Sequence, residues 1–203
     1  MIEWYEETFG VEFNKENVET DTEYHISYVG DTLLVIFHGS TSITDWVYNL
    51  KLFSTPYKDM AEKFYVHTGF LKKWKSIQHD VMSHVKSVGI KKVKLRGHSQ
   101  GGALATLCHE DIKFNHPNIK VDTITFGCPR LFAKEGWDVI QSRCSNVVRI
   151  INGNDMVPKL PFEFMGYKHV GTELLIGRRG FPWVGPFDHR ILSYKKSIEK
   201  YEK

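Results

Sequence analysis

The sequence predicts an α/β fold, with a central, mainly parallel sheet flanked by helices. Strand-like runs alternate with helix-like segments along the 203 residues, and strands joined by helical crossovers form parallel sheets. Residues 32–38 are almost continuously apolar, as in a strand buried on both faces. Residues 70–88 carry apolar side chains every three or four positions, the spacing of an amphipathic helix. The length and the 41% hydrophobic content predict one globular domain over residues 1–203.

The expected elements follow one another in a regular order. Gly30 and Asp31 separate two strand-like runs, at residues 22–29 and 32–38, and predict a hairpin. A helix is expected from Phe70 to Val88, with Gly89 as its end. The remaining segments are expected to form strands at residues 91–96, 121–127, 147–152 and 169–177, and helices at 103–114, 133–141 and 188–201.

Composition and charge exclude several classes of protein. A net charge of +3 without a clustered basic face argues against a nucleic-acid partner. No apolar run is long enough for a transmembrane helix, and the N-terminus lacks the basic region and apolar core of a secretory signal. The three cysteines, Cys108, Cys128 and Cys144, are odd in number and form no CxxC pair, so they predict reduced thiols in an intracellular, cytoplasmic protein. A mature chain from which a signal has been removed is the alternative, against which Met1 argues. The ten histidines form no HExxH pair, so no metal or cofactor is expected.

A GxSxG motif, GHSQG at residues 97–101, lies between an expected strand and an expected helix. At such a turn the serine has a strained backbone, and only very small residues fit two positions before and after it. The helix that starts at Gln100 directs its N-terminal dipole and free N–H groups toward the site. The pattern predicts that Ser99 is a nucleophile. An inert serine that caps the helix in a glycine-rich turn is the alternative.

A nucleophilic serine needs a base and a carboxylate that orients the base, and in this class of turn both follow the serine in the chain. Asp155 ends a strand-like run at the carboxyl edge of the sheet, where ligands gather; otherwise it is a turn residue that caps nearby N–H groups. His189 lies in a loop and is preferred as the base over His169, which falls within an expected strand. A surface histidine near a helix start is the alternative for His189. Its neighbour Asp188 is expected to cap the last helix.

Seven motifs occur in order over residues 32–194. They are VIFHGS at 35–40 with DW at 45–46, VHTGF at 66–70, GHSQGGA at 97–103, TFGCPR at 125–130, NGNDMVPKLP at 152–161, YKHVGTE at 167–173, and DH at 188–189 with Tyr194. In this set the chain resembles the class 3 lipase family, which contains fungal-type triacylglycerol lipases, plant phospholipases A1 and some feruloyl esterases. His38 stands where that family usually has an arginine.

The resemblance implies an α/β-hydrolase fold and a role for each candidate residue. It implies that Ser99 is the nucleophile, Asp155 the acid and His189 the base of a catalytic triad. It further implies that the backbone N–H groups of Ser40 and Gln100 form the oxyanion hole.

The resemblance also implies a short, lid-like segment at about residues 41–60, with a helix over residues 41–50 and Trp46 on its inner face. A fixed surface helix whose apolar face is permanently buried is the alternative. Residues 181–187, which include Trp183, precede the proposed base. They either line an acyl groove, rest on a lipid surface or pack onto the core.

Together these residues predict a serine hydrolase that cleaves carboxylic esters of lipids, acylglycerols or phospholipids, through an acyl-enzyme. The expected partner is a lipid or other ester substrate, with transient contact with a membrane or lipid-droplet surface. The alternative is a catalytically inactive, lipase-like module that binds lipid or protein partners.

Overall fold

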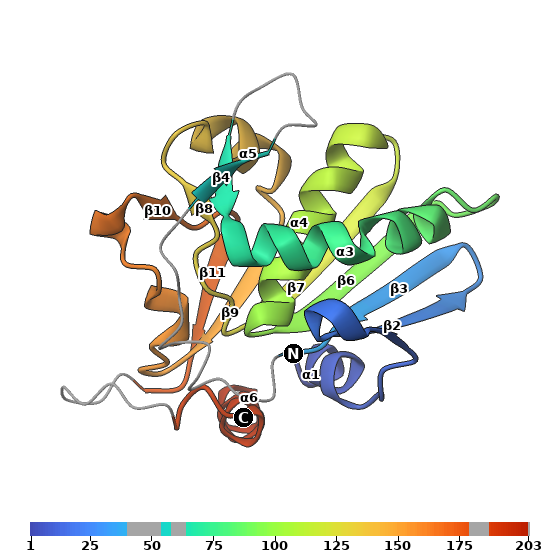
Figure 1. Cartoon of the computed structure of the whole chain (residues 1–203). Coiled ribbons are helices and arrows are strands. Elements are labelled where there is room, and N and C mark those ends of the chain that lie inside the picture. The colour runs from blue at the N-terminus through green and yellow to red at the C-terminus, as the bar shows by residue number, and fades with distance from the viewer. Residues whose placement is uncertain (40–53, 58–63, 179–186, 203) are drawn as a thin grey trace.

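A seven-stranded sheet forms the centre of the molecule, in the order β1-β2-β3-β6-β7-β9-β11 (Figure 1). The structure is a computed structural model that describes residues 1–39, 54–57, 64–178 and 187–202. From β3 to β11 all neighbouring strands are parallel, whereas β1, β2 and β3 pair antiparallel. The expected α/β fold with a mainly parallel sheet is therefore confirmed. The strands are β1 (Lys15–Asn17), β2 (Thr22–Val29), β3 (Thr32–Phe37), β6 (Lys92–His98), β7 (Lys120–Phe126), β9 (Val148–Asn152) and β11 (Thr172–Ile176).

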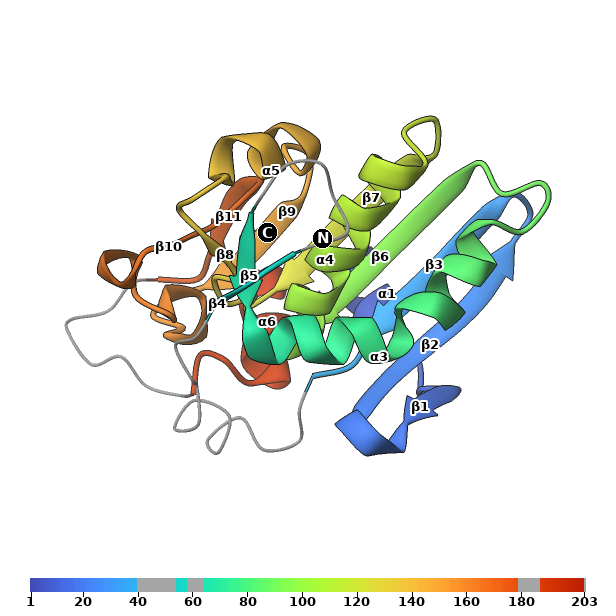
Figure 2. The same ribbon diagram turned by 45° about the horizontal axis from the view of Figure 1, so that its top comes forward.

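Helices cover both faces of the sheet. Figure 2 shows helices on both faces of the sheet. Alternate residues of β7 point to opposite faces, because Thr125 lies beside Gly102 whereas Phe126 packs with Tyr5 and Tyr194. One face carries α3 (Thr68–Val85), α4 (Gln100–Asn115) and α5 (Trp137–Arg143), and the other carries α1 (Ile2–Phe9) and α6 (Ile191–Tyr201), which contact each other. Three short 3-10 helices, η1 (Val18–Thr20), η2 (Val157–Lys159) and η3 (Glu163–Met165), lie in the connections. None of the described helices is long and apolar enough to span a bilayer.

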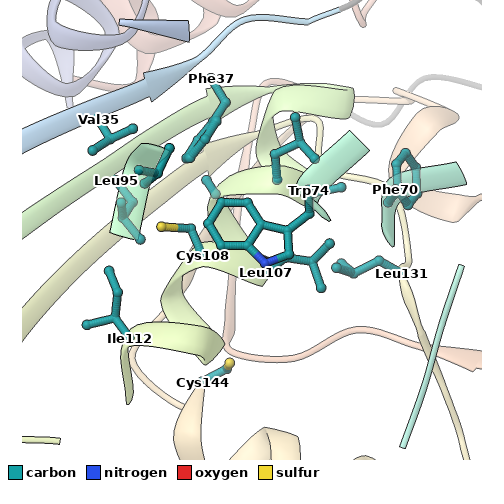
Figure 3. Packing of buried hydrophobic residues seen from close by; sticks show 14 of the residues in the cluster. Val35, Phe37, Phe70, Trp74, Leu95, Leu107, Cys108, Ile112, Leu131 and Cys144 are labelled. Atoms are coloured by element: carbon teal, nitrogen blue, oxygen red, sulfur yellow. The ribbon is translucent and has the colours of Figure 1, made fainter. Parts of the chain in front are cut away.

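The larger core lies under α3 and α4, where Trp74 is fully buried against Phe37 of β3 (Figure 3). The Trp74 indole N–H donates to the Asp111 carboxylate of α4 over 3.2 Å. That carboxylate also accepts from Tyr57 over 3.2 Å and from Asn115 over 2.6 Å. Because these donors surround the carboxylate, the two helices pack with little cost for burying its charge.

A second, antiparallel sheet was not expected from the sequence. It has the order β10-β8-β5-β4, with β4 (Ser54–Pro56), β5 (Tyr65–His67), β8 (Phe132–Ala133) and β10 (Tyr167–Lys168). Its strands have two or three residues each, which is too short for a period of two to be recognised. Residues 54–57 are the only described part of the segment expected to be lid-like, and the expected lid helix lies outside the described residues.

Several element boundaries differ from expectation. Helix α3 ends at Val85 rather than Val88, and the Val88 side chain is fully exposed. Helix α5 begins at Trp137 rather than Ala133, because residues 132–133 pair as β8. His169 lies between β10 and β11 rather than within a strand. Helix α1 was not predicted, because part of its charge faces inward: Glu7 pairs with Lys94 and with Arg96, whose Nε lies 2.8 Å from the Glu7 carboxylate.

Burial makes one histidine of the core sensitive to acid. His109 of α4 bonds the Thr123 hydroxyl over 2.7 Å and the Arg143 carbonyl over 3.2 Å. Burial lowers the pKa of His109 to about 4, so the folded state holds it neutral where the unfolded chain would protonate it below about pH 6.5. Its contribution to stability is therefore complete above about pH 6.5 and is lost as the pH falls toward 4.

We expect the variant His109→Gln to lose less stability than the wild type between pH 7 and pH 5. The difference should be about 2 kcal/mol, since each pKa unit corresponds to about 1.4 kcal/mol. Urea unfolding at both pH values measures it, with His79→Gln on the exposed side of α3 as the matched control. Equal pH dependence of wild type and His109→Gln would show that the fold does not lower the pKa of His109.

Candidate active site

Ser99 occupies a strained turn between β6 and α4. Its backbone angles are φ 56° and ψ −125°, and a positive φ is rare for a residue with a side chain. The turn is held by a hydrogen bond of 2.9 Å from the Ser99 N–H to the Phe126 carbonyl of β7. Strain of this kind persists only where the surroundings enforce it. The expected elbow is therefore present in the fold.

The glycines on either side of Ser99 are required by close backbone contacts. A Cβ atom on Gly97 would lie 2.3 Å from the Gly101 carbonyl oxygen, and one on Gly101 would lie 2.0 Å from the Phe37 carbonyl oxygen. Both distances are far below van der Waals contact. The small residues of the motif therefore let β6, α4 and the end of β3 approach one another around Ser99.

The first turn of α4 supplies hydrogen-bond donors at the same place. Gln100 is the first residue of α4 and is buried. The first N–H groups of a helix have no acceptor in a preceding turn, and they carry the positive end of the helix dipole. The Gln100 N–H can therefore stabilise a negative charge that develops next to Ser99.

Asp155 and His189 form a buried pair. Nδ1 of His189 lies 2.7 Å from Oδ2 of Asp155, and the two side chains are 1% and 0% exposed. The same Oδ2 accepts a hydrogen bond of 2.6 Å from the Tyr194 hydroxyl of α6. The other oxygen, Oδ1, accepts the Val157 N–H over 2.9 Å. The carboxylate thus fixes one histidine tautomer, with the proton on Nδ1 and Nε2 available as a base.

Gly127 brings the serine turn and the Asp155–His189 pair together. It follows Phe126, whose carbonyl holds Ser99, and it has a φ of +58°. A Cβ atom at Gly127 would lie 2.7 Å from Cε1 of His189 and 2.9 Å from Oδ2 of Asp155. The end of β7 is therefore packed directly against the pair. Nε2 of His189 is buried and has no hydrogen-bond partner in the described part of the chain.

His98 contacts both the ring and the backbone of His189. The two rings stack with centroids 4.5 Å apart, and Nε2 of His98 donates to the His189 carbonyl over 2.9 Å. Burial, together with the nearby His189, lowers the pKa of His98 to about 3. His98 is therefore neutral, and stacks on His189 without adding a second charge. Phe9 of α1 and Tyr194 of α6 lie edge-on to the His98 ring.

The structure shows where His169, the other candidate base, and Asp188, the expected helix cap, form their hydrogen bonds. His169 bonds the Pro158 carbonyl over 2.7 Å, and burial holds the pKa of its imidazole well below the ordinary value. It is not hydrogen-bonded to Asp155. Asp188 does not cap α6, whose N-cap is Arg190; its carboxylate accepts the Asn154 N–H over 2.8 Å instead. That expectation was wrong, because the Asp188 side chain turns toward the loop that carries Asp155.

Three of the predicted site residues lie outside the described residues. These are Ser40, the second expected oxyanion donor, and the expected lid and substrate residues Trp46 and Trp183. The described residues hold no cluster of three or more histidine, cysteine, aspartate or glutamate side chains that could bind a metal.

Sequence reasoning missed His98, Gly127 and Tyr194 as parts of the site. His98 and Gly127 lie inside motifs that were recognised, but their contacts cross from one element to another. Tyr194 belongs to the last of the seven motifs, but only the packing of α6 shows that its hydroxyl meets Asp155. The order of elements along a sequence does not fix such contacts.

We expect Gly127→Ala to lower kcat by about 100-fold or more, because the new methyl group displaces His189 from Asp155 and small misplacements are costly. Gly89→Ala is the matched control: Gly89 also has a positive φ, of +91°, but a Cβ atom there would meet nothing within 4 Å in the described part of the chain. Steady-state kinetics with a short-chain ester measures the effect. Wild-type activity in Gly127→Ala would show that the ring of His189 can move without a loss of kcat.

The parallel sheet, the strained serine between β6 and α4, and the buried Asp155–His189 pair define an α/β-hydrolase. The family model for class 3 lipases matches residues 34–165. The chain belongs to this family.

Individual relatives give the same result. The chain is 30% identical to a lipase of Rhizomucor miehei over 152 residues, which are 71% of this chain and 42% of the relative. It is 28% identical to secreted mono- and diacylglycerol lipase A of Penicillium cyclopium over 199 residues, 95% of this chain and 64% of the relative. A solved triacylglycerol lipase, whose catalytic centre is a serine-protease triad, superimposes with a TM-score of 0.72 at 28% identity, covering 81% of this chain and 66% of that one. The chain thus spans between about two fifths and two thirds of the length of the curated relatives it matches.

The prediction of an intracellular protein is contradicted. Relatives from Penicillium cyclopium, Fusarium solani and Malassezia globosa are named as secreted lipases. The prediction was based partly on the unpaired cysteines, and all three are buried in the fold as free thiols. Burial raises the pKa of Cys128 to about 12, so it stays a protonated, small apolar core group. Such a thiol carries no information about the compartment.

Proposed function

We propose that this chain hydrolyses carboxylic esters of lipids, with Ser99 as nucleophile, His189 as general base and acid, and Asp155 as the orienting carboxylate. The observation that carries the proposal is the buried hydrogen bond of 2.7 Å between His189 and Asp155, next to the strained turn of Ser99. The family relatives support it, since they are named as lipases.

The geometry suits acyl transfer in two halves. Nε2 of His189 takes the Ser99 proton while the serine oxygen bonds to the ester carbonyl carbon, and the Asp155 carboxylate stabilises the imidazolium. The imidazolium then gives its proton to the alcohol as the ester C–O bond breaks, which leaves an acyl group on Ser99. Water, deprotonated by the same imidazole, attacks the acyl carbonyl carbon. The bond to the Ser99 oxygen then breaks, the imidazolium returns its proton to that oxygen, and the acid is released.

The negative charge on the carbonyl oxygen needs donors during both halves. We assign one donor to the Gln100 N–H at the start of α4, and the second to the N–H of Ser40. Loss of one donor in such a site costs about 100–1000-fold in rate.

Lipid esters are the proposed substrate class, with acylglycerols and phospholipids both included. Exposed apolar side chains follow the acid and precede the base: Phe162, Phe164 and Met165 at η3, and Phe187. The rings of Phe162 and Phe164 stack with centroids 5.3 Å apart. Contiguous exposed apolar surface beside a site favours transient contact with a lipid surface. A panel of p-nitrophenyl esters, mono-, di- and triacylglycerols and phospholipids identifies the substrate.

We expect Ser99→Ala to fold as the wild type does and to lose both ester turnover and labelling by a fluorophosphonate. The reason is that the hydroxyl is the only group removed, while the backbone turn is held by its own hydrogen bonds. Labelling and circular dichroism measure the two properties. Labelling of Ser99→Ala at the wild-type level would move the nucleophile to another residue. A wild type that neither labels nor turns over any ester would favour a non-catalytic binding module.

We expect His189 and His169 to affect different properties, the first kcat and the second the stability of the fold. His189→Ala should lower kcat by about 1000-fold or more, because the base is lost. His169→Ala should act mainly on the free energy of unfolding, because its bond to the Pro158 carbonyl is lost. Kinetics and urea unfolding of both variants test this. An inactive His169→Ala variant of unchanged stability would contradict the assignment of the base.

A further inference from the structure

A cavity of about 540 Å³ lies between α1, the end of β3 and the start of α6. The described residues that line it include Gly39 and His98 but none of Ser99, Asp155 and His189. It is therefore next to the proposed catalytic residues without being formed by them. Helices α1 and α6 contact each other, and Figure 1 shows both below the sheet.

The walls of this cavity are largely apolar. Phe9 of α1 contributes an aromatic ring, and Ile191 and Leu192 contribute the first turn of α6. Leu192 is 69% exposed and Ile191 43%. Apolar side chains left open to water beside a cavity of this size are typical of a site for an apolar ligand.

The charge in the cavity has one sign. Arg190 and Lys196 are the only ionisable lining residues besides two histidines in the described part, and no acid is among them. Neither cation has a carboxylate partner in the described chain; the Arg190 guanidinium lies over the Phe187 ring, 4.7 Å from its centroid. Burial lowers the pKa of His38, and that of His98 to about 3, so both histidines are neutral. The cavity therefore favours a ligand with a negative charge at one end.

We propose that this cavity binds the anion of a single-chain fatty acid, with the chain against Phe9, Ile191 and Leu192 and the carboxylate near Arg190 and Lys196. The volume suits one chain of about ten carbons or more, because small-molecule sites are about 300–1000 Å³. A neutral ester would leave both cations unpaired. That the ligand is the reaction product rests on the proposed function. Its position behind Gly39 and His98 places the released acid beside the proposed catalytic residues.

Direct binding tests the site without any turnover. Sodium decanoate, below its micelle concentration, is titrated into the Ser99→Ala variant of the whole chain by calorimetry, with decanol as the uncharged probe. Decanoate should bind at least about fivefold more tightly than decanol, because two cations meet one carboxylate. Equal affinity for the two probes would overturn the proposal.

Two lysine variants on α6 locate the ligand. Lys196→Glu should raise the Kd of decanoate by about fivefold or more and that of decanol by less than about twofold, since only charge is reversed. Lys200→Glu is the matched control, because Lys200 lines a different cavity with Arg178 and Tyr201. Equal effects of both variants would indicate general attraction to a basic surface and overturn the site.

Wild type labelled on Ser99 by a phosphonate separates this cavity from the proposed catalytic groove. Decanoate should bind the labelled protein as tightly as the Ser99→Ala variant. Loss of binding on labelling would place the fatty acid in the groove instead and overturn the proposal. Ester turnover without decanoate binding would refute this site alone, whereas decanoate binding without turnover would refute the proposed function alone.

Discussion

The buried carboxylate of Asp155 is the group on which the arrangement of the site depends. It has no cation beside it among the described residues, and a buried charge is costly unless hydrogen bonds replace its water. Three donors do so, from the Val157 backbone, the His189 ring and the Tyr194 hydroxyl. These donors come from the turn after β9, the loop before α6, and α6 itself. One side chain thus fixes the turn at residues 155–157 against His189 and Tyr194, which lie 34 and 39 residues further along the chain.

Neutral imidazole has a second structural role in this protein. His98 and His109 are both buried, and burial lowers the pKa of each. Each ring bonds a backbone carbonyl, of His189 and of Arg143 respectively. His98 therefore joins β6 to the loop before α6, and His109 joins α4 to the end of α5, in both cases without adding a buried charge.

Much of the fold could be predicted because its signals are local. Each of these signals is a pattern within a short stretch of sequence. Examples are the apolar run of β3, the spacing of apolar residues in α3 and the glycines around Ser99. The pairing of Asp155 with His189 also followed from the fixed order of such residues in the chain. Helix α1 could not be predicted in this way, since the reason for its position is an ion pair with β6. Nor could β8 or β10, because two residues contain no period. The hydrogen bond from Tyr194 to Asp155 could not be predicted either, because it depends on how α6 packs against the sheet.

The ion pairs of α1 couple the unfolding of this short helix to the unfolding of the sheet. An isolated helix of eight residues would ordinarily fray, because nucleation is costly and few contacts hold it. Here, departure of α1 removes Glu7 from Arg96, a guanidinium that is 1% exposed and would keep only Asp122 as a charged partner among the described residues. The same departure takes Phe9 away from His98. Helix α1 and the central strand β6 therefore belong to one cooperative unit, and the amides of α1 open only when a substantial part of the sheet opens with them.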